Sequence, residues 1–110
     1  MKNCLFCKII KKEIPSEIIY EDDKIISFKD IRPKAKIHFL IVPKEHIESV
    51  SDLEEKNKDL AGELILTAKK IAEKHNLTGY KLIFNVGRRG GQLIDHIHLH
   101  LVSRDIEELP

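Results

Sequence analysis

The sequence predicts an α+β fold in which one antiparallel sheet packs against a long helix. Five short segments rich in β-branched and other apolar residues are typical of strands. A longer charged segment in the middle of the chain carries apolar residues at helical spacing. Short links between the strands favour antiparallel pairing. With 110 residues, the chain is expected to form one domain, 1–110, with a modest core.

Two helices are predicted. Residues 4–12 place four apolar side chains at near-helical spacing, and this short helix must end before Pro15. The long amphipathic helix starts at Asp52 and runs to about His75. A glycine-rich connection at 87–92 is predicted to be flexible. The predicted strands lie at 17–20, 24–29, 37–42, 80–86 and 96–103.

The composition argues against nucleic acid or a membrane as the main partner. The chain has 19 Lys and Arg against 18 Asp and Glu, a net charge of +1, whereas nucleic-acid-binding domains carry a marked basic excess. No apolar stretch reaches the roughly 18 residues of a membrane span, and the N-terminus lacks the apolar region of a signal peptide. We therefore expect a cytoplasmic protein.

Three of the six histidines, His96, His98 and His100, occupy alternate positions with large aliphatic residues between them. Strand side chains alternate between faces, so the three rings are predicted to form a row on one face of the last strand. Imidazole can act near pH 7 as a nucleophile, an acid and a hydrogen-bond donor. Surface histidines and a metal site are the alternatives, although rings spaced along a strand are too far apart for all three to bind one ion.

The pattern His-φ-His-φ-His-φ-φ at 96–102, in which φ is hydrophobic, resembles the histidine triad (HIT) family. The resemblance covers nearly the whole chain and is closest to the Hint branch, the purine nucleoside phosphoramidases. It implies a HIT-like fold with a five-stranded antiparallel sheet, one long helix and a short N-terminal helix, assembled as a homodimer. The other segments that carry it are 6–10, 14–15, 20–23, 28–31, 38–47, 85–87 and 90–92.

The resemblance also implies a reaction. Family members bind a nucleotide and break a bond at its α-phosphorus through a nucleotidyl-histidine intermediate. The middle histidine, His98, is then the nucleophile, and His96 and His100 donate hydrogen bonds to phosphate oxygens. His38 matches a further histidine beside the triad, and it is either catalytic or a hydrogen-bonded core residue. The chemistry requires no metal ion in this scheme.

A nucleotide site is implied in the same way. Asp30 matches the carboxylate that accepts hydrogen bonds from the ribose, and Asn85 matches a contact to the phosphate or ribose. Gly91 and Gln92 match a loop that closes on the phosphate, where exposed glycine N–H groups can bind an anion. The apolar slot for the base corresponds to residues that can equally be ordinary core: Leu5, Phe6, Ile9, Phe28 and Ile31.

Cys4 and Cys7 are spaced as a metal or redox pair, and a structural disulfide is not expected in a reducing compartment. The βαβ context of thioredoxin-like redox pairs is missing. Similarity to some HIT proteins and to galactose-1-phosphate uridylyltransferases implies a structural zinc site completed by His46 and His96. In that case His96 is not available to the phosphate.

Two residues depart from the Hint pattern. Leu93 replaces the Ser or Thr that contacts the leaving group, and Asp95 places a negative charge where an aromatic residue is common. The leading prediction is a nucleotide hydrolase or transferase that acts on a purine nucleoside phosphoramidate or a related adenylylated substrate, with AMP or a derivative as ligand. The alternatives are a dinucleoside polyphosphate hydrolase and a nucleotide-binding regulator with little turnover.

Overall fold

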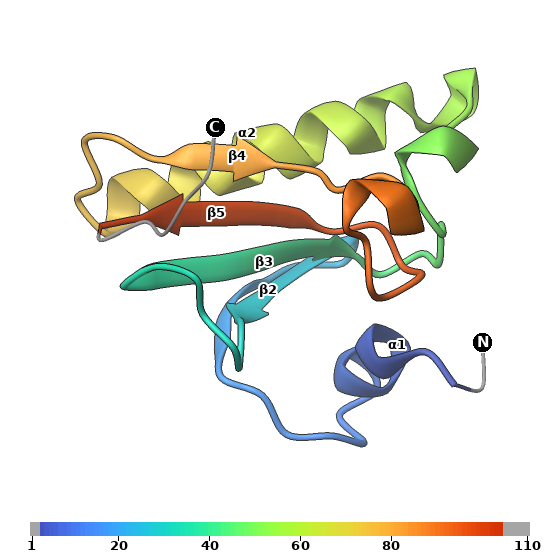
Figure 1. Ribbon diagram of the computed structural model, residues 1–110, viewed down its shortest axis with the longest axis horizontal. Coiled ribbons are helices and arrows are strands. Elements are labelled where there is room, and N and C mark those ends of the chain that lie inside the picture. The colour runs from blue at the N-terminus through green and yellow to red at the C-terminus, as the bar shows by residue number, and fades with distance from the viewer. Residues whose placement is uncertain (1–2, 105–110) are drawn as a thin grey trace.

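The computed structural model describes residues 3–104, and its centre is a five-stranded antiparallel sheet in the order β1-β2-β3-β5-β4 (Figure 1). This confirms the predicted fold class and sheet. The strands are β1 Ile18–Glu21, β2 Ile25–Lys29, β3 Ile37–Pro43, β4 Lys81–Ile83 and β5 Leu99–Ser103.

The two helices lie on opposite faces of the sheet (Figure 1). The long helix α2 (Lys58–Lys74) buries Leu64, Ala68 and Ile71 against one face. The short helix α1 (Leu5–Ile10) packs on the other face in a second, smaller apolar cluster. Each large apolar side chain that is fully buried contributes about 1.5–3 kcal/mol relative to an exposed one, so these two clusters hold the layers together.

Strand alternation divides the side chains of β3 and β5 between the two layers. In β3, Phe39 and Ile41 belong to the α2 cluster, whereas Leu40 belongs to the α1 cluster. Since β5 pairs with β3 in register, with His100 opposite Leu40, its Leu99 and Leu101 also join the α2 cluster. The rings on the other face, toward α1, include His38 and His100.

The last strand begins three residues later than predicted. His96 and His98 lie in an irregular segment before Leu99, so the prediction of one strand carrying three equivalent rings is wrong. Irregular backbone needs partners outside the ladder, and Ile97 N–H donates to Ile47 O at 2.7 Å.

Other boundaries also differ. α2 starts at Lys58, because two 3₁₀ turns at Val50–Asp52 and Glu55–Asn57 take up the chain that was predicted to be its first turns. β4 is shorter than the predicted 80–86. A third 3₁₀ turn, Arg88–Gly90, lies in the connection predicted to be flexible. Among residues 3–104, no helix is long and apolar enough to cross a membrane.

Candidate active site and metal cluster

His98 presents an unpaired ring nitrogen. Its Nδ1 lies 2.7 Å from the backbone oxygen of His96. A carbonyl can only accept a hydrogen bond, so Nδ1 carries the proton and Nε2 keeps its lone pair. Within the described part of the chain, Nε2 has no hydrogen-bond partner. The ring packs edge-on against Phe6, with centroids 5.0 Å apart. A neutral imidazole held in this tautomer can attack an electrophile.

His100 presents a proton instead. The backbone N–H of Lys34 donates to His38 Nδ1 at 2.9 Å, so the proton of His38 is on Nε2. That Nε2 lies 2.9 Å from His100 Nδ1 and donates to it. The proton of His100 is therefore on its Nε2, which is buried without a partner among the described residues. A buried donor without a partner costs free energy of folding, and an acceptor atom of a bound ligand could satisfy it.

Burial keeps these rings neutral. It lowers the pKa of His98 and brings the pKa of His100 down to about 4. It also lowers the pKa of His38, and the nearby Asp30 carboxylate partly opposes that effect. The His98 and His100 rings are 4.9 Å apart, so one neutral nucleophile and one neutral donor lie side by side.

Asp30 lies beside this pair rather than away from it. Its Oδ2 is 3.5 Å from His38 Nε2, and its Oδ1 accepts from the backbone N–H of Arg32 at 2.8 Å. A cleft of about 270 Å³ is lined in part by Asp30 and His38. A larger cleft of about 510 Å³ lies between the turn after β1 and α2, and its lining contains none of the predicted site residues.

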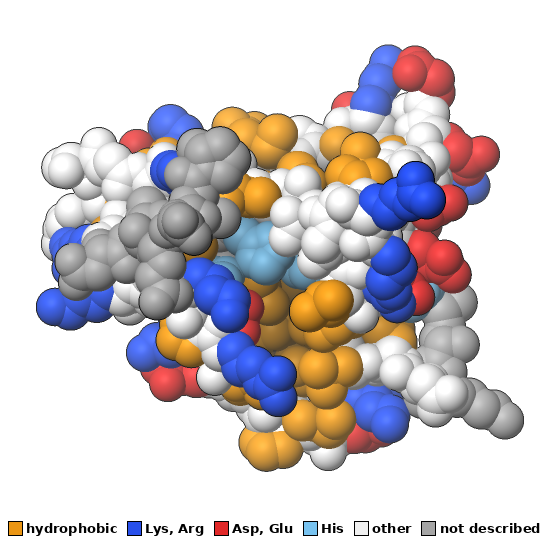
Figure 2. Space-filling view, in the orientation of Figure 1, with side chains coloured by type: hydrophobic (Ala, Val, Ile, Leu, Met, Phe, Trp, Pro, Cys, Tyr) orange, Lys and Arg blue, Asp and Glu red, His pale blue; other side chains and the backbone are white. Residues whose placement is uncertain are grey.

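The predicted apolar slot is mostly packed core between α1 and the sheet. Phe6, Ile9 and Phe28 are buried together, and Leu5 packs against them. Ile31 differs, because 84% of it is exposed. In Figure 2, imidazole side chains reach the surface at the floor of a hollow that hydrophobic side chains border on its lower side.

Four side chains from three separate segments form a candidate metal centre. The Cys4 and Cys7 thiols and the Nδ1 atoms of His46 and His96 lie within 4.8 Å of one another. The Cys–His distances are 3.3, 3.4 and 3.7 Å, and tetrahedral zinc with ordinary bond lengths would require about 3.6 Å. Two sulfurs and two imidazoles are a donor set that zinc prefers.

The outer contacts of His96 also fit a metal ligand. Its Nε2 donates to the Pro43 carbonyl at 2.8 Å, which leaves the lone pair of Nδ1 directed at the two cysteines. Burial lowers its pKa to about 4 and so keeps Nδ1 unprotonated. Both ring nitrogens thus face protein groups. Burial also raises the pKa of the Cys7 thiol, and its hydrogen bond with Cys4 raises it further, so a cation is needed to hold the thiolate form.

A second cluster, Asp30, His38 and His100, also has its ligand atoms within 4.8 Å, but its hydrogen bonds do not fit a metal. His38 Nδ1 accepts from the Lys34 N–H and Nε2 must then carry a proton, so the ring has no lone pair to offer. The ordered hydrogen bonds run instead from Lys34 N–H to His38 and from His38 to His100, with Asp30 beside them.

Hydrogen bonds within the glycine-rich loop use backbone N–H groups that could otherwise bind an anion. The N–H groups of Gly90, Gly91 and Gln92 donate to carbonyls of Gly87 and Arg88 within the loop. Gly91 has φ 91°, a conformation that favours glycine, and its backbone lies against the Asn85 side chain. These contacts do not support the expectation that Gly91 offers a free N–H to phosphate.

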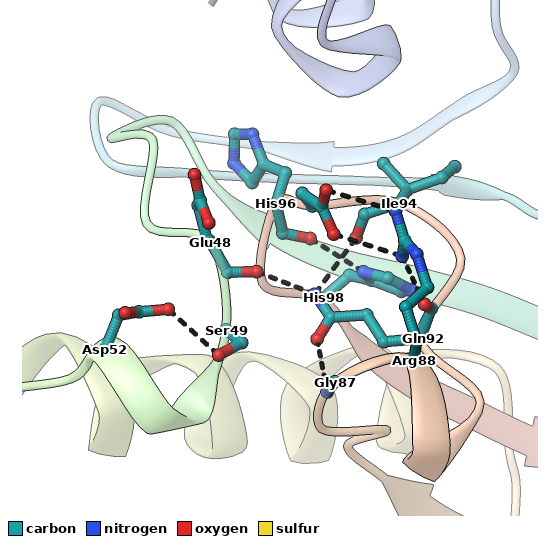
Figure 3. A network of polar contacts seen from close by, with 10 residues as sticks. Glu48, Ser49, Asp52, Gly87, Arg88, Gln92, Ile94, His96 and His98 are labelled. Carbon is teal, nitrogen blue, oxygen red and sulfur yellow. Dashed lines mark hydrogen bonds and ion pairs between the residues drawn. The ribbon is translucent and has the colours of Figure 1, made fainter.

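Gln92 is buried, with 2% of it exposed, and its amide is fully used. Its Oε1 accepts from Gly87 N–H, and its Nε2 donates to the carbonyls of Glu48 and Ile94 (Figure 3). The side chain of Gln92 thus holds the loop to the segment after β3, and the role of the loop at the phosphate stays a prediction. Leu93 is 80% exposed beside it.

Sequence reasoning missed the groups that fix the rings. The Lys34 N–H and the Pro43 and His96 carbonyls are backbone atoms, which a motif does not reveal. The pairing of Arg88 with Asp95 at 3.0 Å was missed as well. Opposite charges seven residues apart on one loop were the only available signal.

Comparison with known proteins identifies the family. Residues 3–109 match a family model described as "Scavenger mRNA decapping enzyme C-term binding". A solved HIT family hydrolase from Legionella pneumophila Philadelphia 1 superimposes with a TM-score of 0.93 and 44% identity, covering 98% of both chains. The chain belongs to the histidine triad family.

Two curated relatives place it further within the histidine triad family. The purine nucleoside phosphoramidase of Escherichia coli K12 is 45% identical over 101 residues, which are 90% of this chain and 85% of that protein. Protein HitA of Neisseria gonorrhoeae is 40% identical over 107 residues, 96% of this chain and all of that protein. The predicted family is therefore confirmed.

Proposed function

We propose that this protein is a nucleotide hydrolase or transferase that cleaves at the α-phosphorus of a purine nucleoside phosphoramidate or a related adenylylated substrate. One observation carries the proposal: His98 and His100 lie side by side with complementary unpaired nitrogens, a lone pair on one and a proton on the other. The similarity to a purine nucleoside phosphoramidase supports the same substrate class.

The mechanism follows from the two nitrogens. His98 Nε2 attacks the α-phosphorus, a new nitrogen–phosphorus bond forms, and the bond to the leaving amine breaks as the amine takes up a proton from solvent water. His100 Nε2–H donates to a non-bridging oxygen, where negative charge concentrates in the transition state. A second water then attacks phosphorus, gives up a proton to solvent, breaks the bond to His98, releases AMP and restores the lone pair. The net reaction consumes one water.

The remaining candidates take supporting roles. His38 holds His100 in the donor tautomer, and Asp30 accepts hydrogen bonds from the ribose. Asn85 contacts the phosphate or ribose side, and the base lies against the apolar cluster of α1.

His96, with both nitrogens facing protein groups, acts as a zinc ligand with Cys4, Cys7 and His46 rather than as a phosphate contact. Zinc there would supply structure, tying α1 to the segment before His98.

Substrate preference tests the proposal. The purified enzyme is expected to hydrolyse an adenosine phosphoramidate with a kcat/KM at least about tenfold above that for diadenosine polyphosphates, if it shares the substrate class of the purine nucleoside phosphoramidase that it resembles. Initial rates on both substrates give this ratio. A reversed ratio would support the dinucleoside polyphosphate hydrolase. AMP binding without turnover of either substrate would support the regulator.

We also infer that the protein is a homodimer joined along β4. β4 lies at the edge of the sheet, and edge strands with exposed apolar side chains tend to pair. The exposed apolar residues include Leu82 and Val86 on or near β4, and Ile65 and Leu66 on α2. Sedimentation is expected to give a dimer for the wild type and a monomer for Leu82→Arg. The control Ile31→Arg, on another exposed loop, should remain dimeric, and a monomeric wild type would refute the inference.

A further inference from the structure

The orientation of His98 depends on a carbonyl that lies outside the sheet. His98 Nδ1–H donates to His96 O, and residues 92–98 precede the first ladder residue of β5. Distant groups hold part of this segment, since Ile97 N–H donates to Ile47 O and Gln92 Nε2 donates to Glu48 O. Local bonds hold the rest: His96 N–H donates to Ile94 O at 2.9 Å, and Ile94 O also accepts from Gln92 Nε2 at 2.9 Å. A continuous chain of hydrogen bonds therefore runs from Gln92 to the His98 ring (Figure 3).

Arg88 binds this segment on its solvent-exposed side. Its guanidinium pairs with Asp95 through two contacts, 3.0 Å to one carboxylate oxygen and 3.1 Å to the other. The same guanidinium donates to the backbone oxygen of Gln92. Arg88 thus joins both ends of the stretch from Gln92 to Asp95, and Asp95 is the residue directly before His96.

The contacts between Arg88 and Asp95 can fix the position of the loop that carries them. One hydrogen bond and one ion-pair contact to the same carboxylate, with a further hydrogen bond to Gln92 O, restrict rotation as a single contact does not, and they use the planar fork of arginine. The two side chains are 59% and 60% exposed, and exposed ion pairs add little to overall stability. An effect of the pair should therefore be local, on the loop and what it supports.

We propose that Arg88 and Asp95 are positioning residues, whose ion pair holds the segment before β5 so that the His96 carbonyl keeps the His98 ring in its reactive orientation. Neither side chain is assigned a contact with substrate. The kinetic consequence rests on the proposed function, whereas the structural consequence does not.

Kinetics test the role against a matched control. Arg88→Ala and Asp95→Ala are each expected to lower kcat on an adenosine phosphoramidate about tenfold, with KM changed less than about twofold and the melting temperature unchanged. The double variant should be no slower than the slower single variant, because both changes remove the same link. Arg88→Lys should not restore the rate, and Arg89→Ala, on the same turn, should behave as wild type.

Two kinetic outcomes would overturn the proposal. If Arg88→Ala raises KM while Asp95→Ala leaves the rate unchanged or faster, Arg88 binds the substrate directly. If both variants have wild-type kcat, the pair does not position His98.

A spectroscopic measurement decides the same point without turnover. Imidazole ¹⁵N–¹H spectra should show only the Nδ1–H tautomer of His98 in wild type and in Arg89→Ala. In Asp95→Ala, the His98 signals should shift toward a mixture of tautomers. Identical His98 signals in all three proteins would refute the positioning role, and a wild type without phosphoramidase activity would refute the proposed function alone.

Discussion

Replacing His98 by asparagine is expected to lower the turnover of an adenosine phosphoramidate by about a thousandfold or more, because it removes the only atom proposed to form a bond with phosphorus. AMP binding should persist, since the apolar cluster and Asp30 are unchanged. Single-turnover rates and equilibrium titration with AMP measure the two effects separately.

The control for this prediction is His75→Asn. His75 follows the last residue of α2 and packs against Phe39, a residue of the α2 cluster on the other face of the sheet. Its loss should leave turnover near the wild-type value. A His98→Asn protein that keeps the wild-type rate would remove His98 from the chemistry, and near-zero rates in both forms would indicate a binding protein.

The second large effect is expected from the metal cluster. The purified protein should contain about one zinc per chain, and Cys4→Ser should lose it, because two sulfurs and two imidazoles complete a closed tetrahedral site. The ion would join α1, the segment after β3 and the segment before β5. Its loss should lower the melting temperature by about 10 °C or more, which corresponds to roughly 2 kcal/mol for a domain of this size.

Metal analysis measures the zinc content, and thermal unfolding measures the change in melting temperature. Treatment of the wild type with a chelator should reproduce the melting temperature of Cys4→Ser, while His75→Asn, which removes a histidine outside the cluster, should keep its zinc. Absence of zinc after preparation under reducing, chelator-free conditions would refute the metal centre.

The fold could be predicted because its determinants are local. Alternation in β3 and β5 sorts side chains between the two layers, and the helical spacing of apolar residues identifies α2 as the covering helix. The later start of α2 could not be read in the same way. Capping contacts at Ser49 and between Glu54 and Asn57 favour two 3₁₀ turns over the helical pattern that begins at Asp52.

The site could be predicted as a set of residues but not as a geometry. The motif named His98 and His100, yet their tautomers depend on backbone atoms of His96 and Lys34. The irregular path before Leu99 depends on contacts far apart in sequence, such as His96 with Pro43 and Gln92 with Glu48. The same contacts explain why His96 leaves the row of three rings.

The loop at 87–92 was predicted to be flexible because glycines usually permit motion. The structure instead contains internal hydrogen bonds, the buried amide of Gln92 and the Arg88–Asp95 pair. None of these follows from composition, since each depends on how the loop folds back over the chain. The departure at Asp95, which suggested an added negative charge beside the site, is a paired charge.

Trapping the intermediate would show whether His98 becomes covalently nucleotidylated. The enzyme would be mixed with an adenosine phosphoramidate, quenched in base within the first turnover, digested and analysed by mass spectrometry. We expect an adenylyl group on His98 in the wild type and none in His98→Asn. Rapid hydrolysis with no adduct on His98, or with the adduct on another residue, would contradict it.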